Sequence, residues 1–152
     1  MSSIDVIINL MARNEEVISR IYKAFYVKFP ELGKFWEQLS IEERGHANIL
    51  RALGKKVGEG KLSIDSRKIN ANQILQMLEH NESLANQVEK KSIKPKKALE
   101  IAFEIENSML EKNIFDVFSG DSPDIQHDFE LLREHTKQHR IRLEQVMKAI
   151  RV

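Results

Sequence analysis

Two residues three positions apart, Glu43 and His46, are the first candidates for chemistry in this chain. Residues at this spacing lie on one face of a helix, so their side chains can hold one cation together. The other members of that face are apolar: Trp36, Leu39, Leu50 and Leu53. A carboxylate and an imidazole inside an apolar stripe must be paired, hydrogen-bonded or bound to a metal, because burying them without a partner is costly.

The second half of the chain holds a matching pattern, in which Glu106 and His139 each interrupt an apolar helical stripe. The other members of these stripes are Leu99, Ala102, Met109 and Asn113 around Glu106, and Phe129, Leu132, Leu143 and Val146 around His139. A Glu would be expected three residues before His139, but Thr136 stands there. A neutral hydroxyl is a poor ligand for a hard divalent cation, so this half of the site lacks a carboxylate. Glu134 or His135 could compensate, His135 by a modest rotation of the helix.

The residue types limit the chemistry of such a site. Carboxylates and imidazoles without thiolate suit iron(II), manganese(II) or zinc. The chain has no Cys, which excludes disulfides, cysteine-based zinc fingers, thiol catalysis and iron–sulfur clusters. A metal-free interpretation stays open at each position. Glu43 and His46 could be a buried polar pair, Glu106 a partly exposed charge and His139 a hydrogen-bonded core histidine.

Helical periodicity runs through the chain and predicts the elements that must position these residues. We expect long helices over about residues 4–29, 30–57, 95–118 and 123–150, and a shorter one over about 72–88. The stripe of the first helix is Ile8, Met11, Glu15, Ile18, Tyr22 and Phe25. Breaks are predicted at residues 58–60 and 119–123, where Ser122 would cap the last helix.

Two helical hairpins, 4–57 and 95–150, joined by a long connection that contains a short helix, are typical of ferritin-like four-helix bundles. The fold class is therefore all-α. A simple up-down bundle and a helical repeat are the alternatives, but we find no repeat of about 34 or about 40 residues.

Four segments then resemble the rubrerythrin branch of the ferritin-like superfamily, in the right order over nearly the whole chain: 15–22, 42–47, 98–106 and 139–143. The resemblance implies metal ligands at Glu15, Glu43, His46, Glu106 and His139. Glu43 would bridge two ions, and each histidine would bind one of them. Tyr22 would hydrogen-bond a carboxylate ligand without binding the metal itself. It also implies a di-iron or related centre that oxidises iron or reduces peroxide, as an oxidoreductase of the ferroxidase or peroxidase type.

The departures from this family bear on the activity. Thr136 removes one of the expected ligands, and Asn113 stands where a second Tyr is common. The site would then hold one ion, or two with water in place of the missing carboxylate. Because the chain has no Cys-rich rubredoxin segment, electrons would have to come from an external donor. The competing hypothesis is a metal-free four-helix bundle that acts as a structural or protein-interaction module.

The composition adds modest limits. At 152 residues, the chain is expected to form a single domain over 1–152. A net charge of +1, with basic residues clustered only at 90–97, favours neither nucleic acid nor an anionic membrane as a partner. No segment reads as a signal peptide or a membrane span, so a cytoplasmic location is expected. A homodimer is also expected, because such bundles often associate along their helices.

Overall fold

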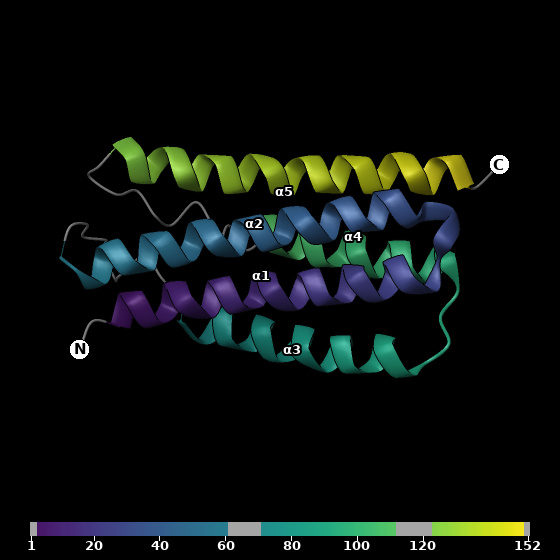
Figure 1. The fold of residues 1–152 in the computed structure, drawn as a ribbon, viewed down its shortest axis with the longest axis horizontal. Helices are drawn as coiled ribbons and strands as arrows, with labels where there is room; N and C mark the ends of the chain where they lie inside the picture. The colour runs from purple at the N-terminus through teal and green to yellow at the C-terminus, as the bar shows by residue number, and fades with distance from the viewer. Residues whose placement is uncertain (1–2, 61–70, 112–122, 151–152) are drawn as a thin grey trace.

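The computed structural model describes residues 3–60, 71–111 and 123–150, and these residues are almost entirely helical (Figure 1). Five α-helices lie in the described ranges, with no strand among them: α1 (Ser3–Lys28), α2 (Gly33–Gly58), α3 (Ala71–Lys90), α4 (Pro95–Glu111) and α5 (Pro123–Ile150). The predicted all-α class is confirmed. None of the described helices is both long and apolar enough to cross a membrane.

The helix boundaries follow the breaks in the sequence, with one difference. Pro30 does not begin α2 itself but opens a short 3₁₀ helix, η1 (Pro30–Leu32), and α2 begins at Gly33. The turn is tight because the Leu32 amide donates to the Phe29 carbonyl, at 3.1 Å. The predicted extension of α4 to about Phe118, the residue Asn113 and the proposed cap Ser122 lie outside the described residues.

A glycine closes α2 at the predicted break. Gly60 has a φ of 75°, a left-handed conformation that a residue without a Cβ adopts at little cost. Its amide donates to the Val57 carbonyl at 3.0 Å, which satisfies one of the last carbonyls of the helix.

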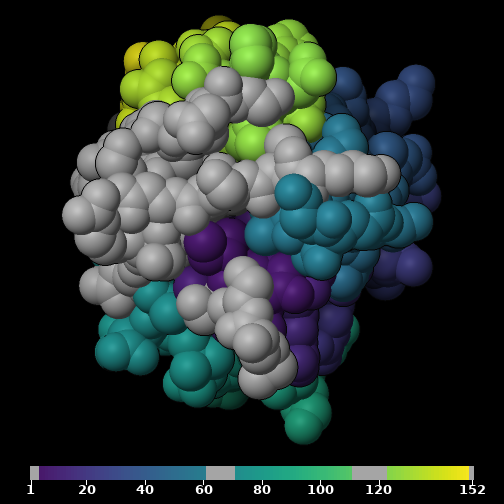
Figure 2. Space-filling view, turned by 90° about the vertical axis from the view of Figure 1, so that its left-hand side faces the viewer, coloured from purple at the N-terminus to yellow at the C-terminus, as the bar shows by residue number. Residues whose placement is uncertain are grey.

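All the helices run along the long axis of the molecule, α1, α3 and α5 in one direction and α2 and α4 in the other (Figure 1). Helix α1 packs along both α2 and α3, and α4 packs along α5. Fewer contacts join α2 to α5 and α1 to α4, so the two helical pairs meet along thinner seams. Seen from one end, α1 (purple) lies between α2 (blue) and α3 (teal), with the start of α5 (green) above them (Figure 2).

Among the described residues the interior is mainly apolar, with a Glu/His group near the middle of the helices and two smaller buried polar pairs, Asn14 with Asn81 and Ser19 with Ser40. Every member of the stripe predicted for α1 is buried, including Glu15 and Tyr22. Trp36 is enclosed by aromatic rings, with its centroid 5.7 Å from that of Tyr22 and 4.8 Å from that of Phe25. The buried polar residues on the four helices α1, α2, α4 and α5 include all the predicted metal ligands.

Candidate metal centre

The five predicted ligands come from four different helices and lie in the interior. Glu15 is on α1, Glu43 and His46 are on α2, Glu106 is on α4 and His139 is on α5. None of these side chains is more than 2% exposed. Each lies on the apolar face that buries its helix, so the packing that forms the core also brings the five side chains inward.

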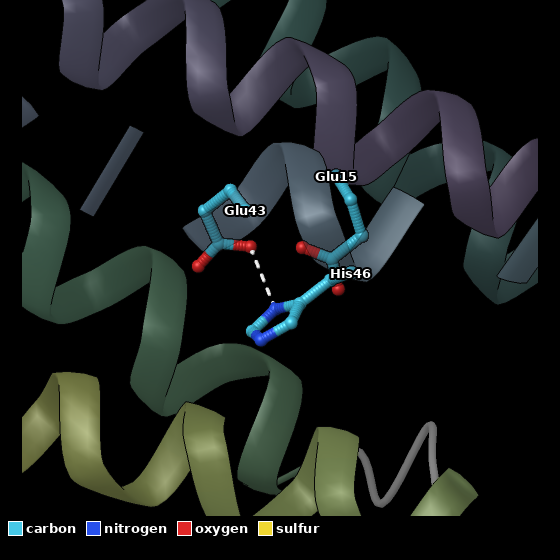
Figure 3. A group of neighbouring side chains, drawn as sticks. All are labelled: Glu15, Glu43 and His46. Carbon is cyan, nitrogen blue, oxygen red and sulfur yellow. Dashed lines mark hydrogen bonds and ion pairs between the residues drawn. The ribbon is translucent and has the colours of Figure 1, made fainter. Parts of the chain in front are cut away.

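Glu15, Glu43 and His46 form a first triad. One ligand atom from each lies within 4.8 Å of the others. Nδ1 of His46 is 3.3 Å from Oε2 of Glu43, and Figure 3 shows both carboxylates directed toward the imidazole ring. Glu15 shares a hydrogen bond with Glu43, while its Oε2 has no hydrogen-bond partner among the described residues. A buried carboxylate oxygen of this kind can bind a cation.

Glu43, Glu106 and His139 form a second triad, so Glu43 belongs to both. Nδ1 of His139 is 2.8 Å from Oε1 of Glu43 and 3.1 Å from Oε1 of Glu106. The Tyr22 hydroxyl donates to the same Glu106 oxygen at 2.8 Å. Oε2 of Glu106, like Oε2 of Glu15, has no partner among the described residues. Tyr22 therefore contacts a carboxylate of the group.

The substituted position contributes no ligand atom to either triad. Thr136 is fully buried, and its hydroxyl donates to the Leu132 carbonyl of its own helix at 2.8 Å. Glu134 does not compensate, because its side chain is exposed and lies 3.8 Å from the ammonium of Lys137. The second triad thus has three protein ligands.

Both imidazoles present Nδ1 to the carboxylates and Nε2 to a further side chain. Nε2 of His139 is 3.1 Å from Oε1 of Glu42, which also accepts a hydrogen bond from Arg142 at 2.9 Å. Nε2 of His46 is 3.0 Å from Nδ1 of His135, and the two rings stack with centroids 5.1 Å apart. His135 therefore lies behind His46 rather than in the position of the missing ligand.

Sequence reasoning did not assign a role to Glu42. It lies off the apolar stripe of its helix, and its partners His139 and Arg142 follow about a hundred residues later. His135 was a candidate ligand, but its contact with the outer nitrogen of His46 depends on how α2 and α5 meet. No local signal in the sequence predicts either contact.

Burial and charge move the pKa values of the carboxylates apart. Burial, and next the neighbouring charge of Glu43, raises the pKa of Glu15 well above its ordinary value and that of Glu106 to about 8. Burial also acts to raise the pKa of Glu43, but the hydrogen bond from Glu15 and the charges of His46 and His139 outweigh it and lower that pKa. Glu15 and Glu106 therefore keep their protons to a higher pH than Glu43 does.

The histidines that face the carboxylates are affected by the same groups. Burial lowers the pKa of His139, but the charge of Glu106 and the hydrogen bonds to Glu106, Glu42 and Glu43 raise it to about 12. The hydrogen bonds from His139 and from Arg142 lower the pKa of Glu42 to about 2. His139 is thus an imidazolium between carboxylates, which is the position a cation would take.

The donor set fits one or two divalent cations. It contains three carboxylates, two imidazole Nδ1 atoms and no thiolate, which are the ligands preferred by iron(II) and manganese(II). Two of its carboxylate oxygens have no hydrogen-bond partner in the part of the chain that the structure describes. Each imidazole has a partner on its outer nitrogen, as metal-bound histidines commonly do.

Protein-family models, curated proteins and solved structures were each compared with the chain, and none of them matches it. The resemblance to rubrerythrins therefore stays a prediction from the four sequence segments.

Proposed function

We propose that the chain is a ferritin-like four-helix bundle that binds a di-metal centre. Helices α1, α2, α4 and α5 would form the bundle, and α3 would belong to the crossover between its two hairpins. The observation that carries the proposal is the pair of buried triads that share Glu43. The unpartnered oxygens of Glu15 and Glu106 support it, because each marks one triad with an unsatisfied acceptor.

In this proposal the chain's own residues have distinct roles. Glu43 would bind both ions, Glu15 and His46 would complete one position, and Glu106 and His139 would complete the other. Tyr22 would orient Glu106 through the hydrogen bond that its hydroxyl donates to Oε1. The surrounding core excludes bulk water from all five side chains. Iron or manganese would supply the redox chemistry, with dioxygen or peroxide as the oxidant and an external electron donor.

A metal-free bundle is the second candidate, and two observations favour it. Nδ1 of His139 contacts both Glu43 and Glu106, so a protonated imidazole already compensates part of the buried negative charge. The Thr136 hydroxyl is also satisfied within its own helix. In that case the polar group would only fix how the two hairpins dock.

Metal content after anaerobic loading with iron(II) or manganese(II) separates the two candidates. We would measure bound metal by mass spectrometry in the wild type, in Glu43→Gln, and in the matched control Glu37→Gln, an exposed residue on the same helix. Glu43→Gln keeps the size of the side chain but removes the charge common to both triads. We expect it to lose both ions, while Glu37→Gln binds metal as the wild type does.

Single-triad variants give the stoichiometry of each position. Glu15→Gln should weaken binding of only the ion held with His46. Glu106→Gln should weaken binding of only the ion held with His139. A wild type that binds no metal would overturn the proposal and favour the metal-free bundle. The homodimer and the cytoplasmic location expected from the sequence stay predictions.

A further inference from the structure

The two inward-facing imidazoles have outer partners of different chemistry. His139 contacts the carboxylate of Glu42, which Arg142 holds in place. His46 contacts another imidazole, that of His135, at 3.0 Å between Nε2 and Nδ1. Both contacts bridge α2 and α5, along the seam where these two helices share few packing contacts.

The proton on an imidazole decides what its outer partner must be. If His46 binds a cation through Nδ1, the nitrogen that faces Glu43, its remaining proton is on Nε2. That N–H then needs an acceptor, and Nδ1 of His135 lies within hydrogen-bond distance of it. His135 can accept there only with its own proton on its other nitrogen, so the contact fixes the tautomer of both rings.

We propose that His135 is a positioning residue for a metal ligand: it accepts the Nε2 proton of His46 and holds that ring with Nδ1 directed at the cation. This inference rests on the proposed metal centre. It assigns to the Glu15 position an orienting partner that is neutral, whereas Glu42 gives the Glu106 position an anionic one. The two positions are then held independently, each by its own outer contact.

The geometry explains why His46 needs such a partner. His46 is almost completely buried, yet the contacts of its two nitrogens among the described residues are with Glu43 and His135. His135 is half-buried on α5, so its removal would open the outer side of the His46 ring to water and leave the ring free to turn. Loss of a partner of this kind typically weakens metal binding by about 10- to 100-fold.

Four substitutions test the proposal with Co²⁺ as the probe, because its absorption spectrum reports both affinity and coordination. His135→Ala removes the acceptor, and His135→Leu removes it while filling the space. His135→Asn places a carbonyl oxygen near the position of Nδ1. His127→Ala is the matched control, because His127 is exposed on the same helix.

We expect Ala and Leu at position 135 to weaken the affinity for one of the two Co²⁺ ions by about tenfold or more and to change the absorption bands of that ion. Asn should restore most of the affinity, and His127→Ala should leave both ions unchanged. The melting temperatures of the metal-free Leu and Asn variants show whether either change acts through folding instead.

The outcomes distinguish this proposal from the one on which it rests. Wild-type protein that binds Co²⁺, with Ala and Leu variants of equal affinity, would overturn the role of His135 alone. Equal weakening in Asn and Leu would also overturn it, because the loss would then come from packing. Wild-type protein that binds no Co²⁺ would overturn both proposals.

Discussion

Position 136 has a hydroxyl where the arrangement on α2 would place a carboxylate. Glu43 and His46 are three residues apart, and Thr136 stands at the same spacing before His139. Its hydroxyl donates to the Leu132 carbonyl, a common arrangement for Thr inside a helix. Because position 136 adds no further carboxylate, the group has less mutual repulsion than four carboxylates would have, which favours folding without a cation. In the proposed metal centre the same absence would weaken binding of the second ion.

Thr136→Glu should reverse this balance. We expect tighter binding of the second ion, because a fourth carboxylate would join the group, and a metal-free protein less stable by about 2 kcal/mol, because that carboxylate would be buried without a partner. Urea unfolding with and without Mn²⁺ measures both effects. Thr136→Gln is the control, since it has the size but not the charge. If Gln and Glu raise the affinity equally, charge is not the cause.

For single residues, the sequence predicts which side chains share the buried face of a helix. It does not predict which side chains on different helices contact each other. Glu43, His46, Glu106 and His139 stood out because each interrupts an apolar stripe, and the structure buries all four. Glu42 did not, because an exposed-looking Glu beside a buried one carries no local signal. Its contact with His139 exists only because α2 and α5 lie side by side.

Among the helices, α1 and α2 are joined most closely beside the first triad. The Ser19 hydroxyl is 2.8 Å from the Ser40 carbonyl and 2.9 Å from the Ser40 hydroxyl, which in turn is 2.9 Å from the Ser19 carbonyl. Ser19 lies one turn after Glu15, and Ser40 lies one turn before Glu43. These small residues let the two helices approach closely, and their hydrogen bonds fix the axial register that places Glu15 opposite Glu43. Sequence periodicity indicates which face of a helix is buried but not its axial register against a neighbouring helix.

Gly45 lies between the two proposed ligands on α2 and weakens the helix there without a packing role. A Cβ at this position would meet nothing within 4 Å. We expect Gly45→Ala to stabilise the protein by about 1 kcal/mol, because Ala has the higher helix propensity, with the metal content unchanged. Thermal unfolding measures the change in stability, and mass spectrometry measures the metal content.

Gly54→Ala on the same helix is the comparison. There a Cβ would lie 3.4 Å from side-chain atoms of both Ile8 and Asn9 on α1, so the gain should be smaller or absent. A larger gain at Gly54 than at Gly45 would contradict this interpretation of the α1–α2 contact.

The protonation of the buried group connects the stability of the whole molecule to pH. The pKa of Glu106 is raised from 4.5 to about 8, so in this range the folded protein keeps a proton that the unfolded chain loses. The free energy of unfolding therefore falls as the pH rises from 4.5 to about 8. The pKa of His139 is raised from 6.5 to about 12, so its contribution is complete below 6.5 and is lost toward 12. The pKa of Glu42 is lowered from 4.5 to about 2, so its contribution is complete above 4.5 and is lost toward 2.

These three groups place the greatest stability of the metal-free protein near pH 4.5, with a decline on either side. Urea unfolding between pH 3 and pH 9 in the presence of a chelator should show this maximum. Saturating Mn²⁺ should oppose the decline at higher pH, because the ion replaces the protons on Glu106 and His139. Stability of the metal-free protein that rises from pH 4.5 to pH 8 would contradict the assignment.

The position of the single tryptophan gives the molecule an optical reporter of its own centre. Trp36 is fully buried, and its indole nitrogen has no hydrogen-bond partner among the described residues. Its ring lies against Tyr22, whose hydroxyl reaches Glu106. One indole in a dry, aromatic surrounding thus lies two side chains away from a carboxylate of the centre. We therefore expect its fluorescence to respond, without any added label, when a cation binds at the proposed centre.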